Sequence, residues 1–144
     1  MSAPFNKFQS FVTKDSAGVF AAALNADTDT LKAYLSNTTP NAATMTVKAD
    51  LAEIAAGSGY SAGGVDVQNA ATTTTGTITV VGTDFVITAA GGTIGPFRYV
   101  VLYDDTPTSP ADPLIGWWDY GSSITLQDGE TFTTDFGASL FTKA

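Results

Sequence analysis

The residue types most able to carry chemistry gather between positions 91 and 121 of this 144-residue chain. The stretch contains the only arginine, Arg98, and both tryptophans, Trp117 and Trp118, with a carboxylate beside them at Asp119. Aromatic rings next to carboxylates suggest sugar stacking and the paired-carboxylate chemistry of glycoside hydrolysis. Alternation along an extended strand argues against a single site, because it points Trp117 and Trp118 to opposite faces. We therefore expect one ring to fill the core and the other to lie at a surface or subunit contact.

Arg98 allows the most specific prediction from a single residue, because it begins an otherwise apolar run in which a charge needs a partner. A structural ion pair or hydrogen bond with a carboxylate such as Asp119 is the favoured interpretation. A subunit contact is the alternative, because arginine and large aromatic residues are enriched at protein interfaces. The candidate interface residues are Phe5, Phe8, Arg98, Trp117, Trp118 and Tyr120.

The loop Asp104–Asp112 holds three aspartates, and carboxylate oxygens are the ligands that calcium prefers. Its spacing does not match an EF-hand loop, and prolines with paired aspartates are ordinary loop residues. The glycine pairs, such as Gly63–Gly64, are not followed by the Lys-Ser/Thr and helix of a phosphate-binding loop. We therefore predict no metal site and no cofactor.

The composition excludes whole classes of chemistry. The chain contains no Cys and no His, which excludes the usual zinc sites and a Ser-His-Asp hydrolase, so we expect no enzymatic activity. Its formal charge is −8 and its six basic residues are scattered, so neither nucleic acid nor an anionic membrane is expected as a partner.

No apolar run approaches the roughly 20 residues that cross a bilayer, and residues 1–11 lack the pattern of a secretory signal. We expect synthesis in the cytoplasm without Sec export.

Two adjacent strands, Phe97–Tyr103 and Leu114–Tyr120, form the predicted centre of a sheet and are joined by the Pro- and Asp-rich loop. Further strands are predicted at Thr30–Leu35, Gly76–Val81 and Asp84–Ala89. The Asp128-Gly129 pair predicts a hairpin that returns Ser123–Leu126 into Thr131–Phe136.

Two short helices are predicted near the N-terminus. Phe5, Phe8, Phe11 and Val12 follow helical spacing over residues 4–12, where they indicate core contacts or, alternatively, an arm that docks on a neighbouring subunit. Lys48–Ala55 allows a turn or two of helix, ending near Gly57.

The predicted fold is mainly β: a single-domain antiparallel β-sandwich or jelly-roll over residues 1–144, with one or two short N-terminal helices. Residues 1–56 supply the N-terminal arm or helix and the first strand region, and residues 57–144 form the sandwich body.

Three blocks of sequence carry a resemblance to a known family. These blocks are Asp50–Gly64, Ala90–Tyr103 and Pro113–Leu126, with Phe5–Phe8 and Asp29–Pro40 fitting the same pattern. In this order they resemble a family of small structural proteins encoded by tailed bacteriophages. Residues 13–22 depart from that pattern, which leaves the predicted N-terminal helix and docking arm without support from the family.

The resemblance implies a non-enzymatic component of the virion, made in the host cytoplasm. A compact, acidic, Thr-rich β domain suits a capsid decoration (cement) protein, which bridges subunits of the major capsid protein and self-associates as a trimer or dimer. A tail, neck or fibre component is the first alternative. The second is a host-glycan-binding module that uses Trp117 or Trp118.

Overall fold

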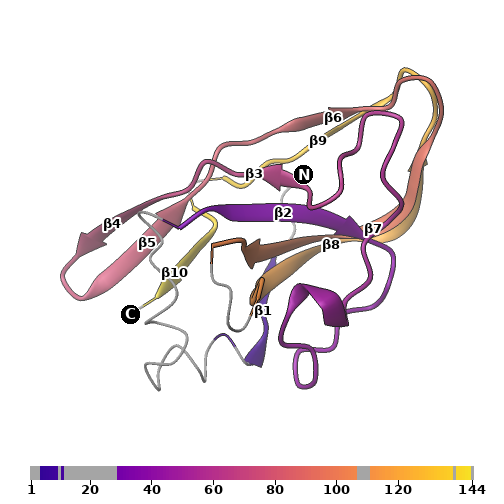
Figure 1. The fold of residues 1–144 in the computed structure, drawn as a ribbon. Helices are drawn as coiled ribbons and strands as arrows, with labels where there is room; N and C mark the ends of the chain where they lie inside the picture. The colour runs from indigo at the N-terminus through magenta and orange to yellow at the C-terminus, as the bar shows by residue number, and fades with distance from the viewer. Residues whose placement is uncertain (1–3, 10, 12–28, 107–110, 138, 144) are drawn as a thin grey trace.

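The computed structural model describes residues 4–9, 11, 29–106, 111–137 and 139–143 (Figure 1). Within these ranges the chain forms ten strands and one 3-10 turn, η1, and Gln9 and Phe11 are also helical. Their bounds are β1 Phe5–Lys7, β2 Leu31–Ser36, η1 Lys48–Asp50, β3 Val65–Asp66, β4 Ala70–Thr74, β5 Thr77–Val81, β6 Val86–Thr88, β7 Ile94–Asp104, β8 Leu114–Leu126, β9 Thr131–Thr133 and β10 Phe141–Lys143.

The strands form three antiparallel sheets. The largest has the order β1-β8-β7-β2-β3, and the smaller ones have the orders β10-β5-β4 and β6-β9. Figure 1 shows β6 and β9 running above the large sheet, in the upper part of the view. β4, β5 and β10 lie at the left. The predicted mainly β, sandwich-like antiparallel fold is confirmed.

The predicted central strand pair is also confirmed. β7 and β8 pair over most of their length, from Tyr103 opposite Leu114 to Ile94 opposite Leu126. β2 pairs with the other side of β7, from Leu31 opposite Asp104 to Ser36 opposite Tyr99. A strand buried on both faces has a continuous apolar sequence, which explains the apolar run Tyr99–Tyr103 of β7.

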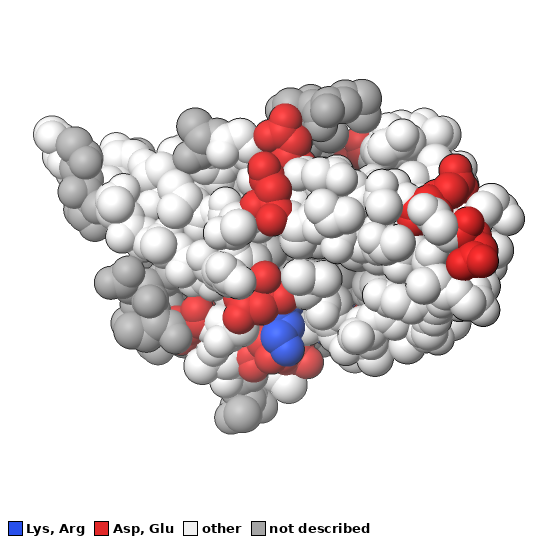
Figure 2. Space-filling view, turned by 90° about the horizontal axis from the view of Figure 1, so that it is seen from above, with Lys and Arg blue, Asp and Glu red and all other residues white. Residues whose placement is uncertain are grey.

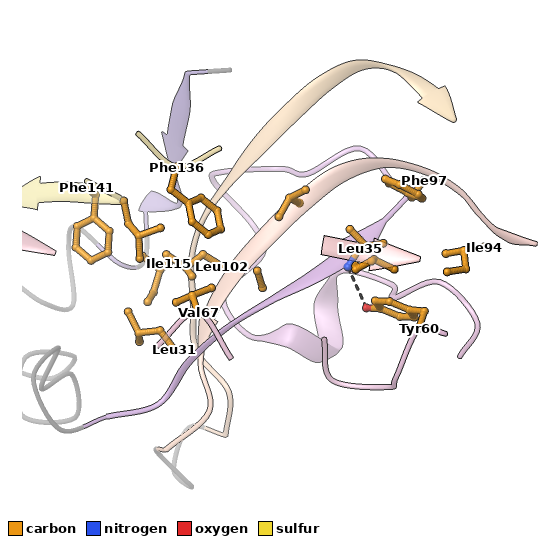
Figure 3. Close-up of a cluster of buried hydrophobic side chains, with 14 of the residues drawn as sticks. Leu31, Leu35, Tyr60, Val67, Ile94, Phe97, Leu102, Ile115, Phe136 and Phe141 are labelled. Atoms are coloured by element: carbon orange, nitrogen blue, oxygen red, sulfur yellow. Dashed lines mark hydrogen bonds between the residues drawn. The ribbon is translucent and has the colours of Figure 1, made fainter. Parts of the chain in front are cut away.

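Two separate hydrophobic clusters cover the two faces of the large sheet. The larger cluster lies between this sheet and the smaller sheets and includes Leu102, Ile115 and Phe136 (Figure 3). The smaller cluster contains Tyr34, Val101 and Tyr103 and is closed by Leu51, from the segment just after η1. Alternate residues of one strand therefore enter different cores, as the period of two in a strand requires.

The first predicted helix is confirmed only in part, and the second is corrected. Gln9 and Phe11 are helical as predicted, and residues 10 and 12 lie outside the described residues. Phe5–Lys7, however, form β1, which pairs with Gly116–Trp118 of β8. A free sheet edge offers this segment backbone partners that isolated helical spacing cannot anticipate. Only the 3-10 turn Lys48–Asp50 forms in the second predicted helix, because the chain turns there to place Leu51 in the smaller cluster.

The predicted hairpin at Asp128-Gly129 is wrong in its pairing. A turn does form, with the N–H of Glu130 donating to the Gln127 carbonyl over 2.9 Å. The strand that follows, β9, pairs with β6 and not with β8. The turn therefore carries the chain from the large sheet into the opposite layer, where Phe132 faces the larger cluster.

Gly116 provides a direct test of how β1 docks. A Cβ atom added there would lie 2.3 Å from Phe5 Cζ and 2.4 Å from the Asn6 carbonyl oxygen. We expect Gly116→Ala to displace β1 and to cost about 1–3 kcal/mol in the free energy of unfolding, as overpacking does. The tryptophan emission should also move to the red, because Phe5 and Phe8 pack on the two indole rings.

Gly121→Ala is the control, because nothing lies within 4 Å of a Cβ added there, although its φ of +104° makes the substitution strained. This variant should lose stability without the red shift. Unchanged emission in Gly116→Ala would contradict the placement of β1.

Candidate functional site

A groove of about 520 Å³ opens between the inner face of β8 and strand β9. The segment from Glu130 to Phe136 lines one side, and Trp118, Tyr120, Ile124 and Leu126 line the other. No residue of β6 contributes to the lining. The groove therefore follows the side of β9 that faces away from its partner strand.

Aromatic rings from both layers form the floor of the groove. Trp118 lies 5.2 Å from Phe136 between ring centroids, and Tyr120 lies 6.0 Å from Phe132. Phe132 in turn meets Phe97 edge to face at 5.0 Å. Tyr120 is 42% exposed, so part of this aromatic surface faces solvent. The arrangement fits an apolar binding surface with polar groups at its margin.

The charged residues that line the groove are both acidic. Glu130 and Asp135 are exposed, and neither Lys nor Arg contributes to the lining. Figure 2 shows the side of the molecule that carries β6 and β9, where acidic side chains lie in several groups with a single basic group among them. The surroundings of the groove therefore attract cations.

The ion pair predicted for Arg98 is confirmed. Its Nε and Nη2 donate to the two carboxylate oxygens of Asp119 at 2.8 and 3.0 Å. The hydrogen bonds from Arg98, and a further one from the Gly121 N–H, hold the pKa of Asp119 below its usual value. Both side chains are more than a third exposed, so solvent screens the pair. Its geometric effect is to join β7 to β8 beside the register shift between Phe97 and Tyr99.

The two tryptophans face opposite sides of the sheet, as predicted. Trp117 packs on Phe8 at 4.7 Å and adjoins the smaller cluster. Trp118 packs on Phe5 at 4.8 Å and adjoins the larger cluster and the groove. Each ring is half-buried, so neither fills a core completely.

The six candidate interface residues thus fall into three settings. Phe8 is fully buried, and Phe5 is half-buried against Trp118. Arg98 and Trp117 lie on the side of the smaller cluster. Trp118 and Tyr120 line the groove, and Tyr120 is the most exposed of the six. A role for any of them in a subunit contact stays a prediction.

The acidic loop does not gather its carboxylates at one point. Asp104 is buried at the end of β7, where it lies opposite Leu31 of β2, whereas Asp105 forms an ion pair with Lys32 at 3.0 Å. The pKa of Asp112 is raised by burial and by the nearby charge of Asp105. Within the described part of the chain, no group of three or more acidic, His or Cys side chains is placed to hold a metal ion.

Asp104 is the most perturbed of these carboxyl groups. Burial, and then a hydrogen bond shared with the Asp29 carboxyl, raise its pKa to about 8. Its Oδ1 accepts the Thr106 N–H at 3.1 Å, while the buried Oδ2 meets no donor among the described residues. A proton held on this carboxyl lets it donate to Asp29, so the folded protein favours the protonated form.

Glu53 forms a second polar centre that the sequence did not reveal. Its carboxylate accepts hydrogen bonds from Lys48 Nζ at 2.7 Å, the Tyr60 hydroxyl at 2.6 Å and the Gly63 N–H at 2.8 Å. Burial alone would raise the pKa of Glu53, but these donors outweigh it and lower the pKa. The Tyr60 hydroxyl also accepts the Leu35 N–H (Figure 3). This network attaches the 48–64 segment to β2 and is structural.

Comparisons with protein-family models, with curated proteins and with solved structures find no match to this chain. Among the described residues, no helix has the length and apolar character of a membrane span. The groove at β8 and β9 is therefore the candidate functional site on geometric grounds.

The Asp104 carboxyl predicts a pH dependence of stability. Its pKa rises from about 3.9 in an unfolded chain to about 8 in the fold, so its contribution is complete below pH 4 and is lost as pH rises through 8. The slope from this group is at most about 1.4 kcal/mol per pH unit. Asp104→Asn should remove it, so the variant should gain stability relative to the wild type between pH 5 and pH 8.5 in urea titrations.

Asp66→Asn is the matched control, because Asp66 is exposed and accepts only a local hydrogen bond from the Gln68 N–H in the described structure. Its stability difference from the wild type should stay constant over the same pH range. A constant difference for Asp104→Asn as well would contradict the buried protonated carboxyl.

Proposed function

We propose that this protein is a non-enzymatic structural component of a phage virion, and that it acts as a capsid decoration protein that bridges subunits of the major capsid protein. The proposal is supported by the sequence resemblance, whose three blocks coincide with the parts that hold the fold together. Asp50–Gly64 contains Glu53 and two of its donors, Tyr60 and Gly63, and Ala90–Tyr103 and Pro113–Leu126 contain nearly all of β7 and β8.

The observation that carries the proposal is the groove along β9. Its floor is aromatic, its exposed rim is acidic, and it follows a strand edge, which together favour a protein partner. A decoration protein binds at many equivalent positions on one shell. Multiple contacts raise the overall affinity, so a modest affinity at each groove is sufficient.

A glycan-binding module is the second candidate, and the position of Trp118 and Tyr120 in the groove favours it. Aromatic faces of this kind stack on sugar rings, and the neighbouring Thr131 and Thr133 offer hydroxyl groups. For a glycan-binding module, adding a soluble host polysaccharide to the protein at millimolar concentration should shift the tryptophan emission.

Copy number and location in purified particles test the proposed function. A decoration protein should approach the abundance of the major capsid protein in quantitatively stained gels, and cryo-electron microscopy should place its density on the outer shell. Density for this chain confined to the tail would contradict capsid decoration and would favour the tail, neck or fibre alternative. Absence from purified particles would contradict a structural role in the virion.

A further inference from the structure

The outer edge of β9 presents backbone groups without a strand partner in the described part of the chain. The Ala89 N–H donates to the Glu130 carbonyl at 2.9 Å, and the Thr134 N–H donates to the Phe85 carbonyl at 3.0 Å. Because an antiparallel ladder alternates, the backbone groups of Thr131 and Thr133 then face away from β6. Such an edge is a template for one more strand.

One edge of β8 also loses its strand partner where the groove begins. β1 pairs only with Gly116–Trp118, although β8 continues to Leu126. The Phe8 N–H donates to the Ile115 carbonyl, so alternation places Pro4 opposite Asp119 in a hydrogen-bonding position. Pro4 has no N–H to donate there, so the ladder ends at Phe5. Beyond Trp118 this edge of β8 therefore has no strand partner in the described part of the chain, beside the Trp118–Leu126 residues that line the groove.

The negative charge around the groove favours some ligands over others. Glu130 and Asp135 line it without a basic residue, and the whole chain carries a formal charge of −8. A second copy of so acidic a chain is repelled, whereas a segment with Lys or Arg is attracted. A sugar would stack on the rings but would not use the unpaired backbone groups of β9 as a strand does.

From these observations we propose that the groove binds an extended polypeptide segment of a partner protein, which adds as a strand to the outer edge of β9. Apolar side chains of the segment pack on Trp118 and Tyr120, and basic side chains at its ends meet Glu130 and Asp135. The inference rests on the proposed docking role and specifies the chemistry of the partner.

A synthetic heptapeptide tests this strand addition with the purified full-length protein. The probe acetyl-KVTFTVK-amide alternates apolar and polar residues and carries a lysine at each end. We expect it to bind with a Kd below about 1 mM, to shift the tryptophan emission, and to move the amide resonances of Thr131 and Thr133 more than that of Thr88 on β6.

Two altered peptides separate the contributions. Acetyl-EVTFTVE-amide should bind about tenfold more weakly, because its charges repel the rim. A version N-methylated at alternate backbone positions should also lose about tenfold or more, because it cannot form the ladder. Equal binding of all three peptides, or no binding of the first at millimolar concentration, would overturn the proposal. So would a β-1,4-linked glucose hexamer that moves the same resonances when the peptide does not.

Matched protein variants locate the contacts. Asp135→Asn and Asp66→Asn remove the same charge, and each parent carboxylate accepts the N–H two residues later. Only the first should weaken peptide binding, by about two- to fivefold. Tyr120→Ala should weaken it by about tenfold, while Val86→Ala, at an exposed position on β6, should not. Equal effects within either pair would place binding elsewhere.

These binding measurements use the isolated protein, so their outcome is independent of where the chain lies in a particle. A protein that is absent from the capsid but binds the heptapeptide would refute capsid decoration alone. A capsid protein that does not bind it would refute strand addition alone.

Discussion

The ladder between β7 and β8 is the constraint on which the other layers depend. These two long strands expose side chains to both faces of the sheet, and each face is covered by its own hydrophobic cluster. Neither cluster can form without the ladder, because Val101 and Leu102 are adjacent in sequence and enter different ones. The Arg98–Asp119 pair joins the two strands at the point where their register shifts.

The groove lies where the two layers do not close completely. β8 has 13 residues, β1 pairs with only three of them, and β9 lies opposite the Trp118–Leu126 segment without pairing with it. Part of the inner face of β8 is left open there, beside an edge of β9 that has no strand partner among the described residues. A surface of this kind can be extended by another chain without rearranging the core, which is the physical reason to assign it to docking.

The sequence was informative where the local pattern and the tertiary environment agree. The apolar run after Arg98, the opposite faces of Trp117 and Trp118, and the partner of Arg98 all follow from alternation and from the cost of an unpaired charge. It was misleading at Phe5–Lys7, because the edge of β8 decides that conformation. It was also misleading after Gly129, because an Asp-Gly turn does not determine which sheet receives the next strand.

The candidate site itself was only half visible. Trp118 and Tyr120 stand out by residue type, whereas β9 contributes ordinary residues, Thr131 and Thr133, through their backbone groups. A strand edge without a partner has no side-chain pattern by which it could be predicted. The Asp29 and Asp104 carboxyl groups could not be paired from the sequence either, because they lie far apart in it and meet only after β2 and β7 have paired.

Hydrogen exchange of single amides, followed by NMR, tests most directly whether β9 offers a free edge beside a rigid ladder. The amides of Val101 and Leu102 should exchange slowest, and within β9 the Phe132 amide should be protected while those of Thr131 and Thr133 exchange rapidly. Protection of Thr131 and Thr133 equal to that of Phe132 in the isolated protein would mean that the edge is already paired, and would contradict the account.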